Sequence, residues 1–182
     1  MKTYIALLRG INVGGHKKIA MAELRELLNK SGLKNVKTYI QSGNVIFQSS
    51  EEENCKLKDI ITKSILDYFG FGVPVLVWTR SELIEIYNNC PLPEEKKTNS
   101  YFAMLTHIPD KELVIEACQK TYENEEYYII DNCIYFYCAA GYGKAKFNLN
   151  YFERKLKVEA TARNYKTMIK LLSMSEESDS NI

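Results

Sequence analysis

Thr3-Tyr-Ile-Ala-Leu-Leu8 is the stretch that decides the fold of this 182-residue chain. Because the run is apolar almost throughout, it is typical of a central β-strand that is covered on both faces. Arg9-Gly-Ile-Asn-Val-Gly-Gly-His-Lys-Lys18, the glycine-rich loop, follows it directly. Glycines let backbone N–H groups come close to a ligand, and Arg9, Lys17 and Lys18 favour an anion. The sequence therefore predicts a ligand site in this loop.

The glycine-rich loop matches a phosphate-binding P-loop only in part. Gly10 and Gly15 have the four-residue gap of that pattern, but His16 stands where its lysine should be, and Lys17 where a Ser or Thr would hold magnesium. Gly141-Tyr-Gly143 lacks the third glycine of the dinucleotide fingerprint. These departures argue against nucleotide hydrolysis. A turn that only connects a strand to a helix is the alternative interpretation.

Composition narrows the class of protein only a little, because 46% hydrophobic residues is ordinary for a globular chain. No apolar run approaches the roughly 20 residues of a membrane span, and Arg9 cuts the first run short. We therefore expect no signal peptide, no membrane partner and a cytoplasmic location. Five cysteines without a Cys-x-x-Cys, and only two histidines, predict reduced cysteines, no disulfide framework and no metal site. Nothing in the sequence indicates a cofactor.

The net charge of +1 hides a segregation of charge along the chain. Residues 1–50 carry eight Lys and Arg against two Glu, residues 134–170 carry eight against two, and the region between them is acidic. The two basic blocks also hold the glycine-rich motifs, so we predict that they share one anion-binding concavity. Its residues would be Arg9, Asn12 and Lys17 from the first block and Lys144, Lys146 and Arg163 from the second. The alternative is that the charges are scattered over solvated helix faces.

The first half of the chain has the βαββαβ order of a ferredoxin-like unit. Apolar periodicity predicts strands at residues 3–8, 36–40, 44–48 and 73–78, with helices at about residues 21–30 and 51–69 and an extra helix from about residue 80. Because the first strand of this arrangement is central, the apolar run at residues 3–8 suits that position.

Turn and cap residues mark the boundaries of these elements. Gly32 is expected as the left-handed C-terminal cap of the first helix, and Gln41-Ser-Gly-Asn44 as the hairpin turn between the middle strands. Ser50–Glu53 and Thr79–Glu82 have the spacing of capping boxes that open the second helix and the extra helix. Pro74 indicates that the fourth strand lies at a sheet edge, because proline cannot donate to a ladder.

The same order of elements starts again after a charged, proline-containing linker. Strands are expected at residues 101–106, 127–130, 133–138 and 158–161, and helices from Pro109, at 150–156 and at 165–172. The predicted fold class is therefore α+β, with two ferredoxin-like βαββαβ units, each followed by an extra helix. The expected domains are residues 1–90 and 99–174, with a linker at 91–98 and a disordered tail at 175–182.

Four polar clusters supply the candidate ligand-binding residues. They are Arg9, Asn12, Gly14, Gly15 and Lys17 in the glycine-rich loop; Gln41, Ser42 and Asn44 in the hairpin turn; Lys144 and Lys146 in the lysine loop, residues 141–146; and Arg163 and Asn164 before the last helix. Arginine can bind phosphate or carboxylate bidentately, lysine adds a point charge, and amides orient a ligand. Each cluster also has a structural interpretation, as a hairpin turn, a mobile loop or a helix cap.

The leading functional hypothesis is binding of a phosphorylated small molecule or of a nucleic-acid phosphate. One alternative is an enzyme acting on such a ligand with His16 as acid or base, although no catalytic constellation is recognisable. The other is a protein-interaction module that uses a tyrosine-rich sheet, since Tyr127, Tyr128, Tyr135 and Tyr137 fall in the second hairpin. These tyrosines are also suited to packing, or to stacking on bases.

Four motifs together resemble the bacterial domain of unknown function 1697 family. They are Ala6-Leu-Leu-Arg-Gly-Ile-Asn-Val-Gly-Gly15, Tyr39-Ile-Gln-Ser-Gly-Asn-Val45, Gly143-Lys-Ala-Lys146 and Thr161-Ala-Arg-Asn164. The resemblance runs from residue 2 to residue 174, and it implies a duplicated ferredoxin-like α+β fold with no established activity and no known catalytic residue. Ala145 stands where a small hydroxyl residue is commoner in the family, and Tyr165 where tryptophan is commoner.

Overall fold

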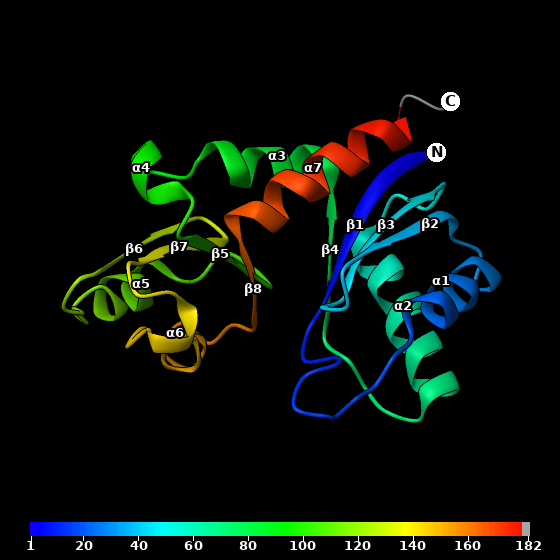
Figure 1. Ribbon diagram of the computed structural model, residues 1–182, viewed down its shortest axis with the longest axis horizontal. Coiled ribbons are helices and arrows are strands. Elements are labelled where there is room, and N and C mark those ends of the chain that lie inside the picture. The colour runs from blue at the N-terminus through cyan, green and yellow to red at the C-terminus, as the bar shows by residue number, and fades with distance from the viewer. Residues whose placement is uncertain (180–182) are drawn as a thin grey trace. The chain divides into compact units, whose positions relative to one another are not determined.

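A computed structural model describes residues 1–179 of the chain, which divide into two compact units (Figure 1). The first unit comprises residues 1–85 and the chain from Lys170 onward, and the second comprises residues 86–169. The first part of the chain forms β1 Lys2–Leu8, α1 Met21–Lys30, β2 Lys34–Tyr39, β3 Asn44–Ser49, α2 Asn54–Phe69, β4 Val75–Thr79 and α3 Arg80–Asn88. The rest forms α4 Glu94–Lys97, β5 Ser100–Leu105, α5 Lys111–Ala117, β6 Glu125–Ile130, β7 Cys133–Cys138, the 3-10 helix η1 Tyr142–Lys144, α6 Leu149–Leu156, β8 Ala160–Asn164 and α7 Tyr165–Asp179.

Each unit is built on a four-stranded antiparallel sheet. The strand orders are β2-β3-β1-β4 and β6-β7-β5-β8, so the first strand of each unit lies between the third and the fourth. Both units thus have the ferredoxin-like βαββαβ arrangement, followed by α3 in one case and α7 in the other. The predicted α+β fold class is confirmed.

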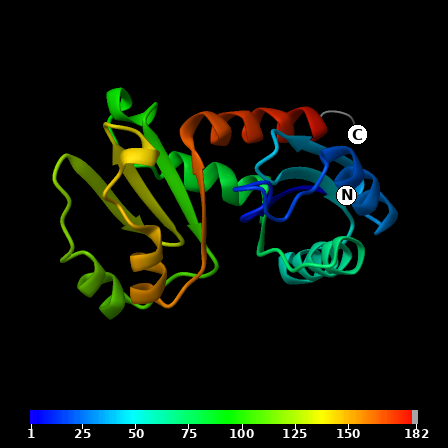
Figure 2. The same cartoon turned by 60° about the horizontal axis from the view of Figure 1, so that its bottom comes forward.

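β1 is the central strand that its sequence predicts. Every residue from Thr3 to Leu8 is buried, and the strand pairs with β3 on one side and with β4 on the other. On one face of this sheet α1 and α2 pack together, and Leu24, Leu28 and Ile61 from these helices join the sheet residues in one apolar core (Figures 1 and 2). The apolar run therefore positions the glycine-rich loop at the end of the buried central strand.

The end of α1 and the position of β4 follow the sequence signals. Gly32 has a φ of +99°, its N–H donates to Asn29 O at 3.1 Å, and the next N–H, of Leu33, donates to Leu28 O at 3.2 Å. This is the Schellman pattern at a helix C-terminus, and Leu33 and Leu28 are both buried. β4 lies at the sheet edge, as Pro74 indicates, so both predictions are confirmed.

The two expected capping boxes have different outcomes. At the start of α3, Thr79 N donates to Glu82 Oε2 at 2.7 Å and Glu82 N donates to Thr79 Oγ1 at 3.2 Å, which confirms a capping box. The box at Ser50–Glu53 is wrong, because α2 begins only at Asn54 with Glu53 as its N-cap. The side chains that accept backbone hydrogen bonds in this turn are those of Ser49 and Glu51.

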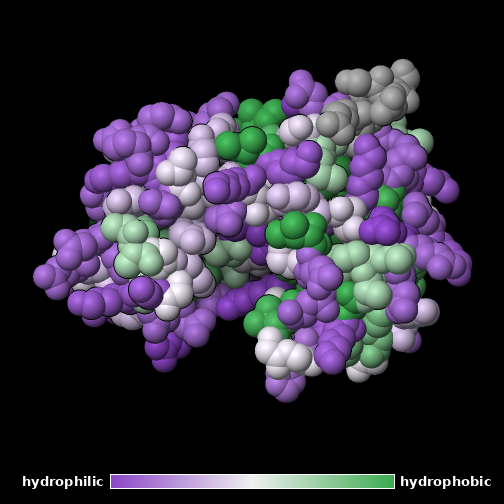
Figure 3. Space-filling view, viewed as in Figure 1, coloured by the Kyte–Doolittle hydropathy of each residue, from purple (hydrophilic) through white to green (hydrophobic). Residues whose placement is uncertain are grey.

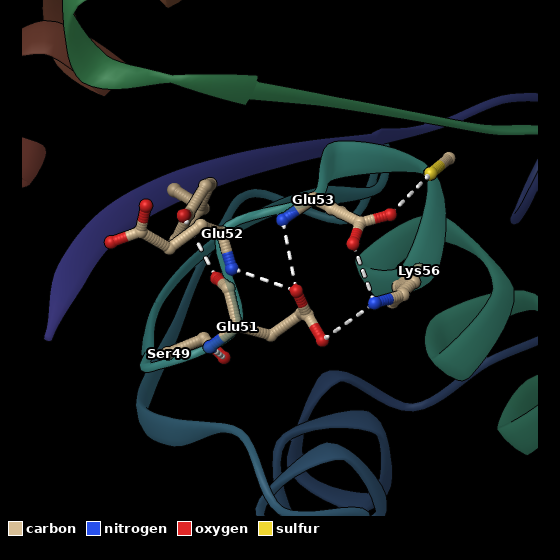
Figure 4. A network of polar contacts seen from close by, with 7 residues as sticks. Ser49, Glu51, Glu52, Glu53 and Lys56 are labelled. Carbon is tan, nitrogen blue, oxygen red and sulfur yellow. Dashed lines mark hydrogen bonds and ion pairs between the residues drawn. The ribbon is translucent and has the colours of Figure 1, made fainter.

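Glu51 organises the turn before α2 (Figure 4). Its carboxylate accepts hydrogen bonds from the backbone N–H groups of Glu52, at 2.9 Å, and Glu53, at 3.0 Å, while its own N–H donates to Ser49 Oγ. Lys56 Nζ lies 3.7 Å from Glu51 Oε2 and 2.5 Å from Glu53 Oε1. The backbone N–H of Glu53 is the largest influence that lowers the pKa of Glu51 from its usual 4.5.

The second sheet packs α5 and α6 on one face over an aromatic core. The Phe147 ring stacks between those of Phe136 and Phe152, with centroid distances of 4.1 and 4.8 Å. Tyr127 OH donates to Ala117 O at 3.0 Å, and Tyr135 OH donates to Ile86 O at 2.7 Å. These two tyrosines of the second hairpin therefore serve packing within their own unit.

Two element boundaries differ from those expected. β8 runs from Ala160 to Asn164, so Arg163 lies in the strand and pairs with Phe102, whereas the expected strand ended at Thr161. As an edge strand, β8 does not need the apolar run by which a buried strand is recognised. α7 continues past Leu172 to Asp179, and the last residues of the expected tail, 180–182, lie outside the described residues.

Gly43→Ala should destabilise the first unit more than Gly70→Ala does. Both glycines have positive φ, +81° and +78°, so alanine adds backbone strain of about 1–2 kcal/mol at either position. Only at Gly43 would the new Cβ also collide, at 2.6 Å from Leu8 Cβ, and overpacking adds about 1–3 kcal/mol. Urea unfolding measures the difference, and equal losses in the two variants would contradict this packing.

The pKa of Glu51 predicts part of the acid sensitivity of the fold. Because the carboxylate has a lower pKa in the folded chain than in the unfolded chain, its contribution is complete above about pH 4.5 and is lost as the pH falls through the folded pKa. Glu51→Gln should therefore show a shallower loss of unfolding free energy below pH 4.5 than the wild type. Parallel pH profiles of the two proteins in urea unfolding would refute this role.

Candidate functional site

The tip of the glycine-rich loop is a tight turn. Val13 and His16 pair as an isolated antiparallel bridge, with His16 N donating to Val13 O at 3.0 Å. Between them, Gly14 and Gly15 have φ values of +59° and +79°. Positive φ at both central residues is what a type I′ hairpin turn requires, so these two glycines serve the backbone geometry of the loop.

Asn12 fastens the base of the loop with all of its side-chain hydrogen-bonding groups. Its Nδ2 donates to Ile19 O at 3.0 Å and to Gln41 O at 2.9 Å, and its Oδ1 accepts from Ile19 N at 2.9 Å. These bonds hold the two ends of the loop together and join the loop to the hairpin turn, so the Asn12 amide has a structural role. The expected role of Asn12 in ligand binding stays a prediction.

Lys17 and Arg9 are also involved in holding the loop. Lys17 Nζ donates to Gly72 O at 2.7 Å, which ties the loop to the segment before β4. Arg9 is half-buried at the end of β1, and its backbone N–H donates to Pro74 O at 3.0 Å. The side chain of Lys17 and the backbone of Arg9 thus both hold the loop against the segment before β4.

Residues 41–44 form a hairpin turn, which is the structural interpretation of this cluster. Asn44 is fully buried, and its Nδ2 donates to Tyr39 O at 3.1 Å and to Ser42 Oγ at 3.0 Å. The side chain of Gln41 is exposed and makes no hydrogen bond within residues 1–179, although its backbone oxygen accepts from Asn12. Of these three candidates, Gln41 is the one with side-chain groups open to a ligand.

A depression of about 730 Å³ lies between the glycine-rich loop, the hairpin turn and the start of α1. We call it the loop depression. Its lining residues are Asn12, Gly15, Lys18, Ile19, Ala20, Met21, Ala22, Glu23 and Gln41. Three candidates from the sequence therefore meet in one place, namely Asn12, Gly15 and Gln41.

The charge of the loop depression comes from two side chains and from the N-terminus of α1. Lys18 and Glu23 are exposed, and neither forms an ion pair within the described part of the chain. Ala20 is the N-cap of α1 and gives no side-chain hydrogen bond, so no side chain caps the first N–H groups of the helix. Such groups carry a partial positive charge and point out of the helix end.

In the second unit, the lysine loop is bonded to two carboxylates of the chain itself, those of Glu123 and Glu125. Glu125 accepts from the backbone N–H of Lys146 at 2.6 Å and of Phe147 at 2.7 Å, and Lys146 Nζ lies 3.5 Å from Glu123 Oε2. Lys146 also lines a smaller depression, of about 260 Å³, beside η1. Lys144 is exposed in η1.

Arg163 and Asn164 lie at the end of β8. Arg163 Nη1 donates to Ala162 O at 2.8 Å, and burial lowers the pKa of Arg163 to about 10, so the guanidinium stays charged at neutral pH. Asn164 Oδ1 accepts from Thr167 N at 2.8 Å, which is the helix-capping alternative for this residue. The concavity predicted from both basic blocks joins residues of different units, and it stays a prediction.

The sequence missed two features of the loop depression, Glu23 and the open start of α1. Lys18 was recognised as favouring an anion but was not among the candidate ligand-binding residues. The available signal was the absence of Ser, Thr, Asp or Asn at Ala20, because a helix that begins without a capping side chain leaves its N–H groups open. His16 is exposed, and its side chain makes no hydrogen bond with any described residue.

The fold places this chain among α+β proteins with an internal repeat of the ferredoxin-like unit. A glycine-rich loop follows its first strand. The family described as protein of unknown function (DUF1697) matches residues 1–135, and the chain belongs to this family. Among solved structures it is similar to conserved bacterial protein SP0830 from Streptococcus pneumoniae, with 27% identity and a TM-score of 0.76 over 96% of this chain and 98% of that one. Comparison with curated proteins gives no match.

Two further features of the described residues bear on other kinds of site. Within residues 1–179, His, Cys, Asp and Glu side chains do not gather in any group of three or more that is placed to hold a metal ion. No helix in the same range is both long enough and apolar enough to cross a membrane.

Asn12→Asp should loosen the loop and lower the stability of the first unit. The aspartate cannot donate, and it would bring a carboxylate against the carbonyl oxygens of Ile19 and Gln41. Leaving these groups unsatisfied costs about 1–3 kcal/mol of unfolding free energy. Asn89→Asp is the control, since Asn89 is exposed and its side chain makes no hydrogen bond within residues 1–179. Urea unfolding should separate the two variants, and matching midpoints would exclude the role given to Asn12.

Proposed function

We propose that this protein binds a phosphate-bearing small molecule in the loop depression. The observation that carries the proposal is that Lys18, Gly15 and the uncapped start of α1 line one depression of about 730 Å³. A volume of this size is in the range of small-molecule sites, roughly 300–1,000 Å³.

The electrostatics of the loop depression favour an anion at one end. The first N–H groups of α1 have no side-chain cap, and a helix N-terminus behaves as roughly half a positive charge. Lys18 adds a full positive charge and forms no ion pair within the described residues, although the Glu23 carboxylate lines the same depression. Phosphate suits this arrangement, because its oxygens accept several hydrogen bonds at once and helix N-termini commonly hold it.

A small molecule fits the first unit better than a nucleic-acid backbone does. Polynucleotide binding needs a series of basic side chains along the surface. Several basic residues of residues 1–50 are engaged elsewhere: Lys17 donates to Gly72 O, Arg25 to Thr38, and Lys30 pairs with Glu26. The face drawn in Figure 3 is mostly hydrophilic, with hydrophobic side chains in small separate groups.

The alternative function, an enzyme that uses His16 as acid or base, has less support. No described residue forms a hydrogen bond that would orient the His16 side chain.

Lys18→Gln should weaken the binding of a simple phosphate monoester. Ethyl phosphate titrated into the labelled protein should shift the amide NMR signals of Gly15, Lys18 and Ala22. The variant should lose about 1–2 kcal/mol of binding free energy, since a hydrogen bond to a charged group is worth about 1.5–3 kcal/mol and this one is partly exposed.

Lys34→Gln is the matched control, because Lys34 is exposed, unpaired within the described residues and absent from the loop depression. It should bind ethyl phosphate as the wild type does. Equal weakening in both variants would mean general attraction to a basic chain, and no shift at Gly15 or Ala22 at any concentration would overturn the proposed function.

A further inference from the structure

We infer that the ligand of the loop depression is a sugar phosphate, that is, a phosphate monoester of a polyhydroxylated carbon chain or ring. This inference rests on the proposed function and names its substrate class. It comes from the side chains at the depression that a phosphate alone does not use: the carboxylate of Glu23 and the amide of Gln41.

The Glu23 carboxylate has no hydrogen-bond or ion-pair partner among residues 1–179. Glu23 and Lys18 line the same depression, yet they form no ion pair with each other or with any other described residue. By contrast, Glu26, three residues further along the same helix, forms an ion pair with Lys30, with 2.6 Å between Glu26 Oε1 and Lys30 Nζ. An ionised carboxylate only accepts hydrogen bonds, so the group that complements Glu23 is a donor on the ligand.

The side-chain amide of Gln41 indicates which kind of donor group the ligand carries. Its side-chain amide offers both donors and an acceptor, and its backbone is held by Asn12 through a 2.9 Å hydrogen bond. A hydroxyl group also donates and accepts, so it can bond to Glu23 and to Gln41 in complementary roles. An ammonium group donates only, and it would leave the amide N–H groups of Gln41 without a partner.

The same carboxylate selects against simple anions. Glu23 repels any dianion that enters the depression, and ethyl phosphate brings no alcohol hydroxyl that would offset this repulsion. A sugar phosphate brings both the anion for Lys18 and the hydroxyls for Glu23. Met21 and Ala22 add apolar surface, against which the C–H groups of a sugar can pack. Selectivity therefore follows from two charges of opposite sign in one depression.

The test compares glucose 6-phosphate with ethyl phosphate on the full-length wild type and on Glu23→Ala, by calorimetry and amide NMR. The wild type should bind glucose 6-phosphate about tenfold more tightly, as expected when hydroxyl groups gain hydrogen bonds to a charged acceptor. In Glu23→Ala the two affinities should move in opposite directions. Ethyl phosphate should bind more tightly, because a repulsive charge is gone, and glucose 6-phosphate more weakly, because its acceptor is gone.

Asp59→Ala is the control, since Asp59 is an exposed carboxylate of α2 outside the depression, and it should keep the wild-type ratio of affinities. If Glu23→Ala tightens both ligands alike, Glu23 acts only through its charge and the inference is overturned, while the proposed function stands. If neither phosphate shifts the signals of Gly15 or Ala22 in the wild type, the proposed function fails first. Equal binding of the two ligands to the wild type also overturns the inference.

Discussion

The close approach of Gly43 to the end of β1 is the constraint on which the candidate site depends. Leu8 N donates to Gly43 O at 2.7 Å, and a Cβ at Gly43 would lie 2.6 Å from that of Leu8. This contact brings the hairpin turn against the start of the glycine-rich loop. Asn12 can then bond to Gln41 O, and the loop depression forms beside this bond. A buried apolar strand and one glycine thus set the position of exposed polar groups.

Most of the fold could be predicted because its signals can be recognised in short stretches of sequence. The left-handed glycine at Gly32 and the capping box at Thr79–Glu82 each describe an interaction within a few residues. The apolar run at residues 3–8 indicates burial by itself, although its partner strands β3 and β4 are distant in sequence. The prediction at Ser50 failed for a reason that is also local: Glu51 bonds to the next two N–H groups itself and delays the start of α2 until Asn54. β8 was placed too early because an edge strand needs no apolar run.

For the candidate site, the sequence indicates which polar residues lie in the glycine-rich loop but not which groups they contact. Sequence shows that Asn12 and Lys17 are polar and lie among glycines, but it does not show that carbonyl oxygens of distant segments satisfy them. Only the fold decides which polar groups remain open, and at the loop depression the side chains of Lys18, Glu23 and Gln41 have no partner within the described residues. Glu23 in particular has the sequence context of a solvated helix face, so its position at the depression depends on how the loop folds back.

The two units share a topology, yet they differ in what they leave for a ligand. In the first unit the chain between β1 and α1 includes the glycine-rich loop, whereas between β5 and α5 only residues 106–110 intervene, with no glycine. The lysine loop of the second unit follows β7 instead. At its end, the Glu125 carboxylate already accepts hydrogen bonds from the backbone N–H groups of Lys146 and of the next residue, Phe147. The anion that the first unit is proposed to take from solution is supplied in the second by its own chain. Repetition of a fold therefore preserves the packing of β1 and β5 without preserving a site, because a loop that the core does not constrain can change its length and its charges.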